Sequence, residues 1–344
     1  MDSSQRIITT VKPVKVILDV DTATGIPCRD VDDGLAIALA LASPEIELIG
    51  ITTCAGNCRT FESTENSLRI LQLAGRDDIP VAEGRELPFL QDVTANFDFL
   101  DGWTHNYGFL WKDVPPLPAV TIPKSSLPAH EFIIKSVREH PNEVVIVKEG
   151  SHTNLALALL VDPGIAPLVK EVIHMGGDTG QPWWASTATS EFDDPDIWQY
   201  VIKMNHTYDP EATVIVAQSK IPFTFVTSQT CLSSLLRMSH VDAMANVGTP
   251  YHDFLAATAR PWVQWQLQYR GREGAVMWDP LTLALVFDSN LFNIVRMRFD
   301  ASQFLSGQYP YLYPSAESPT VQVTMEANGH RFEEIMMERL TRAL

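Results

Sequence analysis

Short apolar segments rich in β-branched residues recur along the chain and are typical of buried strands. They cover residues 14–18, 46–53, 144–147, 171–175 and 221–226. Segments with helical periodicity lie between several of them, at residues 33–42, 62–74, 153–160 and 209–219. Because continuous apolar strands are buried on both faces, this alternation predicts an α/β fold with a mostly parallel central sheet flanked by helices.

The remaining pattern indicates how the chain is organised as a whole. We expect a long helix over residues 252–270, another that begins at Asp279-Pro280, and a final amphipathic helix over residues 332–344. Residues 178–204 are rich in Gly, Pro, Trp, Ser, Thr and Asp, which favours an inserted loop or lid over a linker. Residues 1–344 are therefore interpreted as a single domain with one inserted lid.

Composition and charge narrow the class of protein. The 344 residues include 45% hydrophobic and 19% charged residues, as in ordinary globular proteins, and carry a formal net charge of -17. Such a charge disfavours nucleic-acid binding in the absence of a basic patch. The sequence contains no apolar run of membrane-spanning length and no signal-peptide pattern. Four scattered cysteines predict reduced thiols, and hence a cytoplasmic protein without membrane contact.

Four aspartates are the first candidates for chemistry. Asp19 and Asp21 directly follow the first strand, and Asp32 and Asp33 begin the next helix. Such carboxylates repel one another unless a cation or protons neutralise them. Asp32 and Asp33 alone could simply cap a helix, but the strand-end pair favours a cation site with oxygen ligands, which suits Ca²⁺ or Mg²⁺.

Polar residues also follow the other predicted strands. One strand ends in Ala55-Gly56-Asn57, one in residues 150–154, and one in residues 175–178. Taken singly, each has the composition of an ordinary turn. Because ligands of parallel α/β sheets bind beyond the carboxyl ends of the strands, the three segments together predict one rim around a site.

The order of these motifs resembles that of the nucleoside hydrolases, the Ca²⁺-dependent N-ribohydrolases. The resemblance spans residues 14–285 and is carried by Asp19/Asp21/Asp32/Asp33, Ala55-Gly56-Asn57, Gly150-Ser151-His152-Thr153-Asn154-Leu155-Ala156, Met175-Gly176-Gly177, Asn205 with Asp209-Pro210-Glu211-Ala212, and Trp278-Asp279. The resemblance implies a single-domain nucleoside hydrolase (Rossmann-like) architecture. It also implies Ca²⁺-dependent cleavage of a nucleoside's N-glycosidic bond and assembly as a homodimer or homotetramer.

By matching position, the resemblance implies a role for each of these residues. Ca²⁺ would be held by Asp21, Asp33, Asp279 and the backbone carbonyl of Thr153, with Asp21 also the catalytic base. Its implied substrate-binding residues are Asp32, Asn57, Met175, Asn205 and Asp279.

The leaving base is expected to stack on tryptophan. Many members of the family have a histidine before the late aspartate, whereas this chain has Trp278, as in the purine-preferring branch. Trp103, in the loop that closes over the base in this family, is the candidate for the second wall. The alternatives are that Trp103 is an ordinary packed aromatic residue, and that Trp183 or Trp184 forms the wall. We therefore expect purine ribonucleosides to be preferred over pyrimidine ones.

Two departures from the family pattern leave alternatives open. Residues 22–31 lengthen the segment between the second and third aspartates, and Lys203 stands where the family usually has an acidic residue. The extension either bulges away from the aspartates or remodels the cation site. A catalytically weakened homologue that binds or senses a modified nucleoside is one alternative. An aspartyl-phosphate phosphatase is another, because Asp19-Val20-Asp21 mimics that nucleophile motif.

Overall fold

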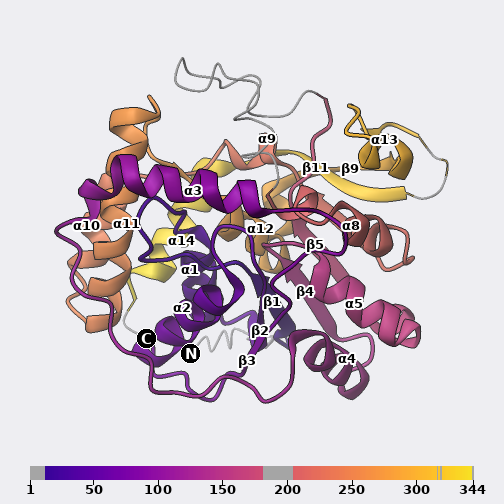
Figure 1. The fold of residues 1–344 in the computed structure, drawn as a ribbon, viewed down its shortest axis with the longest axis horizontal. Helices are drawn as coiled ribbons and strands as arrows, with labels where there is room; N and C mark the ends of the chain where they lie inside the picture. Colours follow the sequence, from indigo (N-terminus) through magenta and orange to yellow (C-terminus); the bar gives the residue numbers. More distant parts are fainter. Residues whose placement is uncertain (1–11, 181–203, 316, 318–319, 343–344) are drawn as a thin grey trace, which may run out of the picture.

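A nine-stranded sheet forms the centre of the computed structural model, which describes residues 12–180, 204–315, 317 and 320–342 (Figure 1). Its strand order is β10-β9-β11-β6-β5-β4-β1-β2-β3. In this spatial order, every pairing between β11 and β3 is parallel, whereas β9 pairs antiparallel with both β11 and β10. The strands are β1 (Val14–Val20), β2 (Ile46–Thr53), β3 (Val81–Glu83), β4 (Val144–Lys148), β5 (Glu171–Met175), β6 (Phe223–Val226), β9 (Phe292–Phe299), β10 (Leu312–Tyr313) and β11 (Thr320–Ala327).

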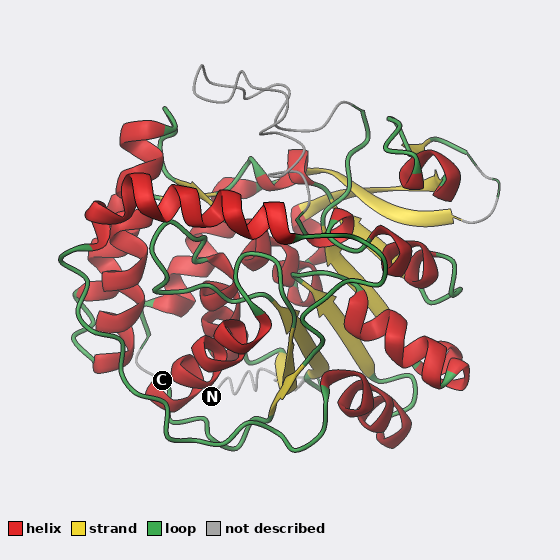
Figure 2. Ribbon diagram, in the orientation of Figure 1, coloured by secondary structure: helices red, strands yellow, loops and turns green. Residues whose placement is uncertain are grey.

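Helices cover both faces of this sheet (Figure 2). One face packs against α1 (Asp32–Leu41), α2 (Thr60–Leu73), α10 (Met238–Ala245), α11 (Pro250–Tyr269), α12 (Trp278–Phe287) and α14 (Gly329–Leu340). The other packs against α4 (Ala129–Glu139), α5 (Thr153–Val161), α8 (Pro210–Ala217) and α13 (Ala301–Leu305). Three further elements are the short helix α9 (Ser228–Cys231) and the two-stranded ribbon β7 (Leu235–Leu236) with β8 (Ala275–Val276). The predicted mostly parallel α/β fold is thus confirmed.

Strand alternation divides the hydrophobic core into two layers. In β1, Val16 and Leu18 face the α1 and α12 side, whereas Ile17 faces the α4 and α5 side. In β4, Val145 and Val147 face the first side and Ile146 faces the second. The same alternation decides which polar side chains beyond each strand end meet.

The centre of the sheet also fixes where a site can form. The chain runs from β1 outward through β2 and β3, then returns to place β4 on the other side of β1. The strand order reverses between β1 and β4, and in open α/β sheets ligands bind in the crevice at such a reversal. The residues after β1 and β4 are therefore the ones that a ligand would meet.

Several predicted elements differ from the observed ones. Residues 94–107 form the helix α3 (Thr94–Tyr107), so the expectation that Trp103 lies in a loop is wrong. Phe97 and Leu100 are buried three residues apart, and Trp103 and Tyr107 continue that apolar side, which is helical spacing. In the nine-stranded sheet, β3, β9, β10 and β11 were not predicted. The proposed lid, residues 178–204, falls almost wholly outside the described residues.

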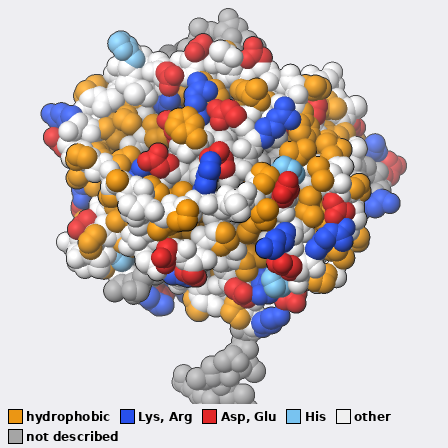
Figure 3. Space-filling view, turned by 60° about the horizontal axis from the view of Figure 1, so that its bottom comes forward, with side chains coloured by type: hydrophobic (Ala, Val, Ile, Leu, Met, Phe, Trp, Pro, Cys, Tyr) orange, Lys and Arg blue, Asp and Glu red, His pale blue; other side chains and the backbone are white. Residues whose placement is uncertain are grey.

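On the surface, charges of both signs are interspersed. In the view of Figure 3, Lys and Arg side chains lie among Asp and Glu side chains and form no continuous basic patch on that face. Among the described residues, no helix combines the length and the apolar character needed to cross a membrane.

Candidate active site

Three buried aspartates meet where two helices begin. Asp32 and Asp33 are the first residues of α1, and Asp279 is the second residue of α12. These helices pack against each other, and oxygen atoms of the three carboxylates lie within 4.8 Å of one another. The Asp279 backbone N–H donates to Asp32 Oδ2 at 3.3 Å. Helix N-termini favour negative charge, but three carboxylates exceed what two termini stabilise.

These carboxylates fit a hard cation. Each has one buried oxygen that no hydrogen bond from the described residues reaches: Oδ1 of Asp32, Oδ2 of Asp33 and Oδ1 of Asp279. Burial raises the pKa of Asp32 to about 6, and burial together with the neighbouring carboxylates raises the pKa of Asp33 and Asp279 well above the usual range. A donor set made only of carboxylate oxygens is the kind that Ca²⁺ and Mg²⁺ prefer.

Asp21 lies beside this cluster and is fully buried. Its backbone N–H donates to Asp33 Oδ1 at 3.0 Å. Its carboxylate accepts two hydrogen bonds from Asn57, one from the backbone N–H to Oδ2 and one from Nδ2 to Oδ1, both 3.0 Å long. Burial raises the pKa of Asp21 to about 6. Gly56 is needed here for space, since a Cβ atom at that position would lie 1.8 Å from Asp21 Oδ2.

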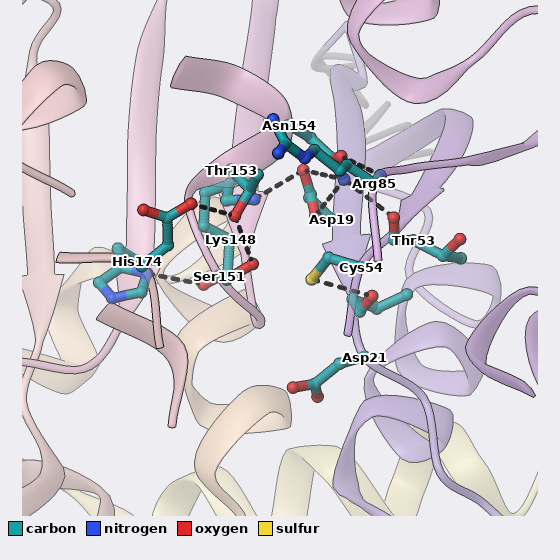
Figure 4. Close-up of polar contacts among 12 residues, drawn as sticks. Asp19, Asp21, Thr53, Cys54, Arg85, Lys148, Ser151, Thr153, Asn154 and His174 are labelled. Carbon is teal, nitrogen blue, oxygen red and sulfur yellow. Dashed lines mark hydrogen bonds and ion pairs between the residues drawn. The ribbon is translucent and has the colours of Figure 1, made fainter. Parts of the chain in front are cut away.

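Asp19 takes part in a separate network on the other face of the sheet. Its Oδ2 lies 2.6 Å from Lys148 Nζ, both side chains are fully buried, and Asn154 donates to the same carboxylate (Figure 4). In Figure 4, Asp21 points away from this network. Because Asp19 is fully buried and paired with Lys148, it is not placed as the exposed nucleophile that a phosphatase would need.

The extension at residues 22–31 packs against α3 and leaves the aspartates together. Arg29 is buried, and its guanidinium donates to the Leu100 carbonyl at 2.7 Å and forms an ion pair with Asp101. The extension also brings in Asp30, which shares a side-chain hydrogen bond with Asp32. Burial and the Asp32 carboxylate raise the pKa of Asp30 well above its usual range. The longer loop therefore adds a carboxylate to the site and does not displace the others.

A pocket of about 170 Å³ opens above the aspartates. Its polar wall includes Asp30, Asp32, Asn57, Asn205 and Asp279. Its aromatic wall is formed by Trp103, Trp262, Trp265 and Trp278. The Trp103 and Trp265 rings lie 5.1 Å apart, and Trp262 stacks on Trp265 at 4.9 Å. Such a pocket offers flat apolar surfaces on one side and hydrogen-bonding groups on the other.

The other predicted residues lie around this pocket or beneath it. Met175 and Asn205 line it, and Asn205 Nδ2 donates to the Met175 carbonyl at 3.2 Å. Asn205 has a φ of 48°, a left-handed conformation that asparagine tolerates better than most residues. Thr153 begins α5, and its hydroxyl donates to Asp209 Oδ2 at 2.7 Å, which ties α5 to the start of α8. Trp183, Trp184 and Lys203 lie outside the described residues.

Sequence reasoning missed two acidic residues of the site, Asp30 and Glu149. Glu149 is the first residue after β4 and is 1% exposed. The available signal was its position, because the residue that directly follows a central strand is the one most often at a ligand site. The tryptophans Trp262 and Trp265 were also missed, since their helix reads as an ordinary core helix.

Comparisons with known proteins agree with the predicted family. The sequence model of the family "Inosine-uridine preferring nucleoside hydrolase" matches residues 16–334. The pyrimidine-specific ribonucleoside hydrolases RihA of Escherichia coli and Citrobacter koseri are each 29% identical over 317 residues, which cover 90% of this chain and 94% of theirs.

Solved structures give the same result. The purine-preferring ribonucleoside hydrolase from Gardnerella vaginalis superimposes with a TM-score of 0.76 at 26% identity, covering 95% of this chain and 98% of that one. A plant nucleoside hydrolase shares the fold, with a TM-score of 0.72 at 24% identity over 96% and 99% of the two chains. The predicted family, fold and enzyme class are thereby confirmed. The chain belongs to the inosine-uridine preferring nucleoside hydrolase family, whose members cleave the N-glycosidic bond of nucleosides.

Proposed function

We propose that this chain hydrolyses the N-glycosidic bond of purine ribonucleosides in a Ca²⁺-dependent reaction. The observation that carries the proposal is the group of Asp32, Asp33 and Asp279, of which Asp32 and Asp279 line a pocket with an aromatic wall. Each of the three has a buried oxygen that no described residue satisfies, as expected for side chains that bind a cation. The homo-oligomeric state and the cytoplasmic location stay predictions.

The cation would be held by Asp33 and Asp279, together with Asp32, whose carboxylate belongs to the same group. The family resemblance adds Asp21, whose backbone N–H donates to Asp33, and the Thr153 carbonyl. A bound Ca²⁺ would polarise a water and fix the sugar hydroxyls in place. Asp21 would accept the proton of the attacking water. This role is supported by the position of Asp21, which is fully buried and whose backbone N–H donates to Asp33 of the group. The two hydrogen bonds from Asn57 orient that carboxylate.

The sugar would lie between the acidic cluster and Asn205. Cleavage of an N-glycosidic bond builds positive charge on the sugar ring, and buried carboxylates around it stabilise that charge. Asn57 and Asn205 offer amide groups to the pocket, and Asp32 and Asp279 offer acceptors. Sugar hydroxyls both donate and accept, so this mixture of groups suits them.

The nucleobase would lie against the aromatic wall. Trp278 lines the pocket next to Asp279, and Trp103 lines it from α3. A bicyclic purine covers more of such a surface than a pyrimidine, which supports the purine preference. Relatives with either preference are known: the RihA proteins are named as pyrimidine-specific and the Gardnerella vaginalis enzyme as purine-preferring.

A panel of nucleosides assayed for free ribose, with and without a chelator, tests the proposal. We expect inosine, adenosine or guanosine to be hydrolysed faster than uridine or cytidine, and the chelator to abolish the reaction until Ca²⁺ is restored. Full activity in the chelator would contradict the cation mechanism. Equal rates on uridine and inosine would contradict the purine preference. Ca²⁺ binding without base release from any nucleoside would instead favour a binding protein that has lost turnover.

A further inference from the structure

Glu149 lies at the point where the strand order reverses, directly after β4. Its backbone N–H donates to the Asp19 carbonyl at 2.8 Å, which extends the pairing of β4 with β1 by one residue. Side chains alternate along a strand, so Glu149 continues the side of Val145 and Val147. That side is the one covered by α1 and α12, and α12 packs against β4. The alternation therefore directs Glu149 toward the helix ends that carry the aspartate cluster.

No described residue compensates the charge of Glu149. The side chain is 1% exposed, and neither of its carboxylate oxygens has a hydrogen-bond partner among the described residues. The adjacent Lys148 points to the opposite face, where its ammonium is paired with Asp19. Burial, followed by the charges of Asp32 and Asp21, raises the pKa of Glu149 well above its usual range. The charge of Glu149 in turn contributes to raising the pKa of Asp33 and of Asp279.

An isolated buried carboxylate is costly, and it is retained only where something offsets its charge. We propose that Glu149 is an outer carboxylate of the cation site, which strengthens cation binding by its charge without contacting the ion. The groups that would contact the ion include Asp32, Asp33 and Asp279, whose oxygens lie within 4.8 Å of one another, and Glu149 is not part of that group. The inference rests on the cation site of the proposed function and adds a residue to it.

The Glu149→Gln variant tests this role, because it removes the charge and keeps the shape. Calorimetric titration with Ca²⁺ should show an affinity roughly 10- to 100-fold lower than that of the wild type, the usual effect of losing an outer-sphere partner. Coulomb energy is proportional to charge. The decrease in the logarithm of the affinity should therefore be about 1.5 times as large for Tb³⁺ as for Ca²⁺. A merely structural role of Glu149 would weaken the two ions alike.

Luminescence lifetimes of bound Tb³⁺ in H₂O and D₂O count the waters on the ion. We expect the same count in the wild type and in Glu149→Gln. An additional water in the variant would place Glu149 on the ion itself and overturn the outer position. Unchanged affinity of Glu149→Gln for both ions would show that Glu149 carries no charge at the cation site and would overturn the proposal. A wild type that binds neither ion would also overturn it.

The control is Glu171→Gln, which removes a carboxylate at the opposite end of the neighbouring strand β5, where it accepts a hydrogen bond from Thr224. It should bind both ions as the wild type does. Thermal melting of the cation-free proteins checks folding, and Glu149→Gln should melt no lower than the wild type, because it loses an uncompensated buried charge. Nucleoside hydrolysis is measured in parallel. If Glu149→Gln binds the ions more weakly but the wild type hydrolyses no nucleoside, only the proposed function is contradicted. If Glu149→Gln binds both ions normally and the wild type is active, only the role of Glu149 is contradicted.

Discussion

At the same strand ends, buried charges form an ion pair on one face of the sheet and stay uncompensated by described residues on the other. On the α4 and α5 face, the Asp19 carboxylate meets the Lys148 ammonium at 2.6 Å, and both are fully buried. On the α1 and α12 face, Asp32, Asp33 and Asp279 gather with Glu149 and Asp21 nearby, and the described residues supply no ammonium or guanidinium ion pair to any of them. The Asp19–Lys148 pair balances its own charge, whereas the carboxylates of the second face require protons or a cation.

This difference separates a structural charge pair from a functional charge cluster. A buried ion pair whose members satisfy each other serves the fold, and breaking it leaves one charge stranded. A cluster of like charges that is destabilising by itself is retained because a ligand stabilises it. The two faces should therefore respond differently to substitution, to cations and to pH.

The largest effect is expected from Asp21→Asn. In saturating Ca²⁺ this variant should lose roughly 100- to 10,000-fold in kcat, the usual contribution of a general base, while its circular dichroism spectrum stays that of the wild type. Asn57 can still donate to the amide oxygen that replaces one carboxylate oxygen. Asp242→Asn, in an exposed pair with Arg260, should leave kcat unchanged and serves as the control. A retained rate in Asp21→Asn would remove Asp21 as the base.

The next effect concerns the paired face. Lys148→Met should lower the free energy of unfolding by about 3 to 5 kcal/mol, because Asp19 is left buried without its counter-charge. Added Ca²⁺ should not restore this loss, since Asp19 faces away from the cation site. Lys124→Met removes a half-exposed partner of Glu83 and should change stability by no more than about 1 kcal/mol. Urea unfolding measures both. Equal stability of Lys148→Met and the wild type would show that the Asp19 pair is dispensable.

The order of motifs in the sequence was enough to predict the fold family and most of the site. Asp32 and Asp279 are 247 residues apart in the chain, yet Asp279 N–H donates to Asp32. Periodicity alone cannot bring two such positions together, and only the resemblance to a known family did. Where the prediction used local pattern in place of that resemblance, it found β1, β2, β4, β5 and β6 but missed the short strands β3 and β10 as well as β9 and β11. The latter two are flanking strands with alternating polar residues, and their apolar signal is weaker.

Glu149 and Trp103 show why the rest could not be predicted. Whether the side chain after a strand faces one helix layer or the other depends on the register of that strand, and a shift of one residue would exchange Lys148 and Glu149. The sequence does not fix that register by itself. Trp103 was expected in a loop because the family resemblance was loose there, and the helical spacing of Phe97, Leu100 and Trp103 was not weighed against it.

The smallest effect, and the one most specific to the uncompensated face, is on pH dependence. Burial raises the pKa of Asp21 and Asp32 to about 6 from 3.8 in the unfolded chain. Between these values the folded, cation-free protein binds more protons than the unfolded chain, so these two groups stabilise it as the pH falls and cease to do so as the pH rises through 6. A cation needs the deprotonated carboxylates, so protons compete with it in the same window.

The stabilisation that Ca²⁺ confers should therefore shrink as the pH falls below about 6, with an apparent affinity reduced by up to about tenfold per pH unit for each carboxylate that must lose its proton. The measurement is the difference in melting temperature with and without Ca²⁺ at each pH. Titrating groups away from the cation site, such as the buried histidines of the opposite face, are present in both samples and cancel in that difference. Asp32→Asn should shift the onset to lower pH or flatten the profile, because one competing proton is gone. A Ca²⁺ effect that stays constant from pH 7 to pH 5 would mean that these carboxylates are already ionised without the cation, and the contrast between the two faces would then lie in geometry alone.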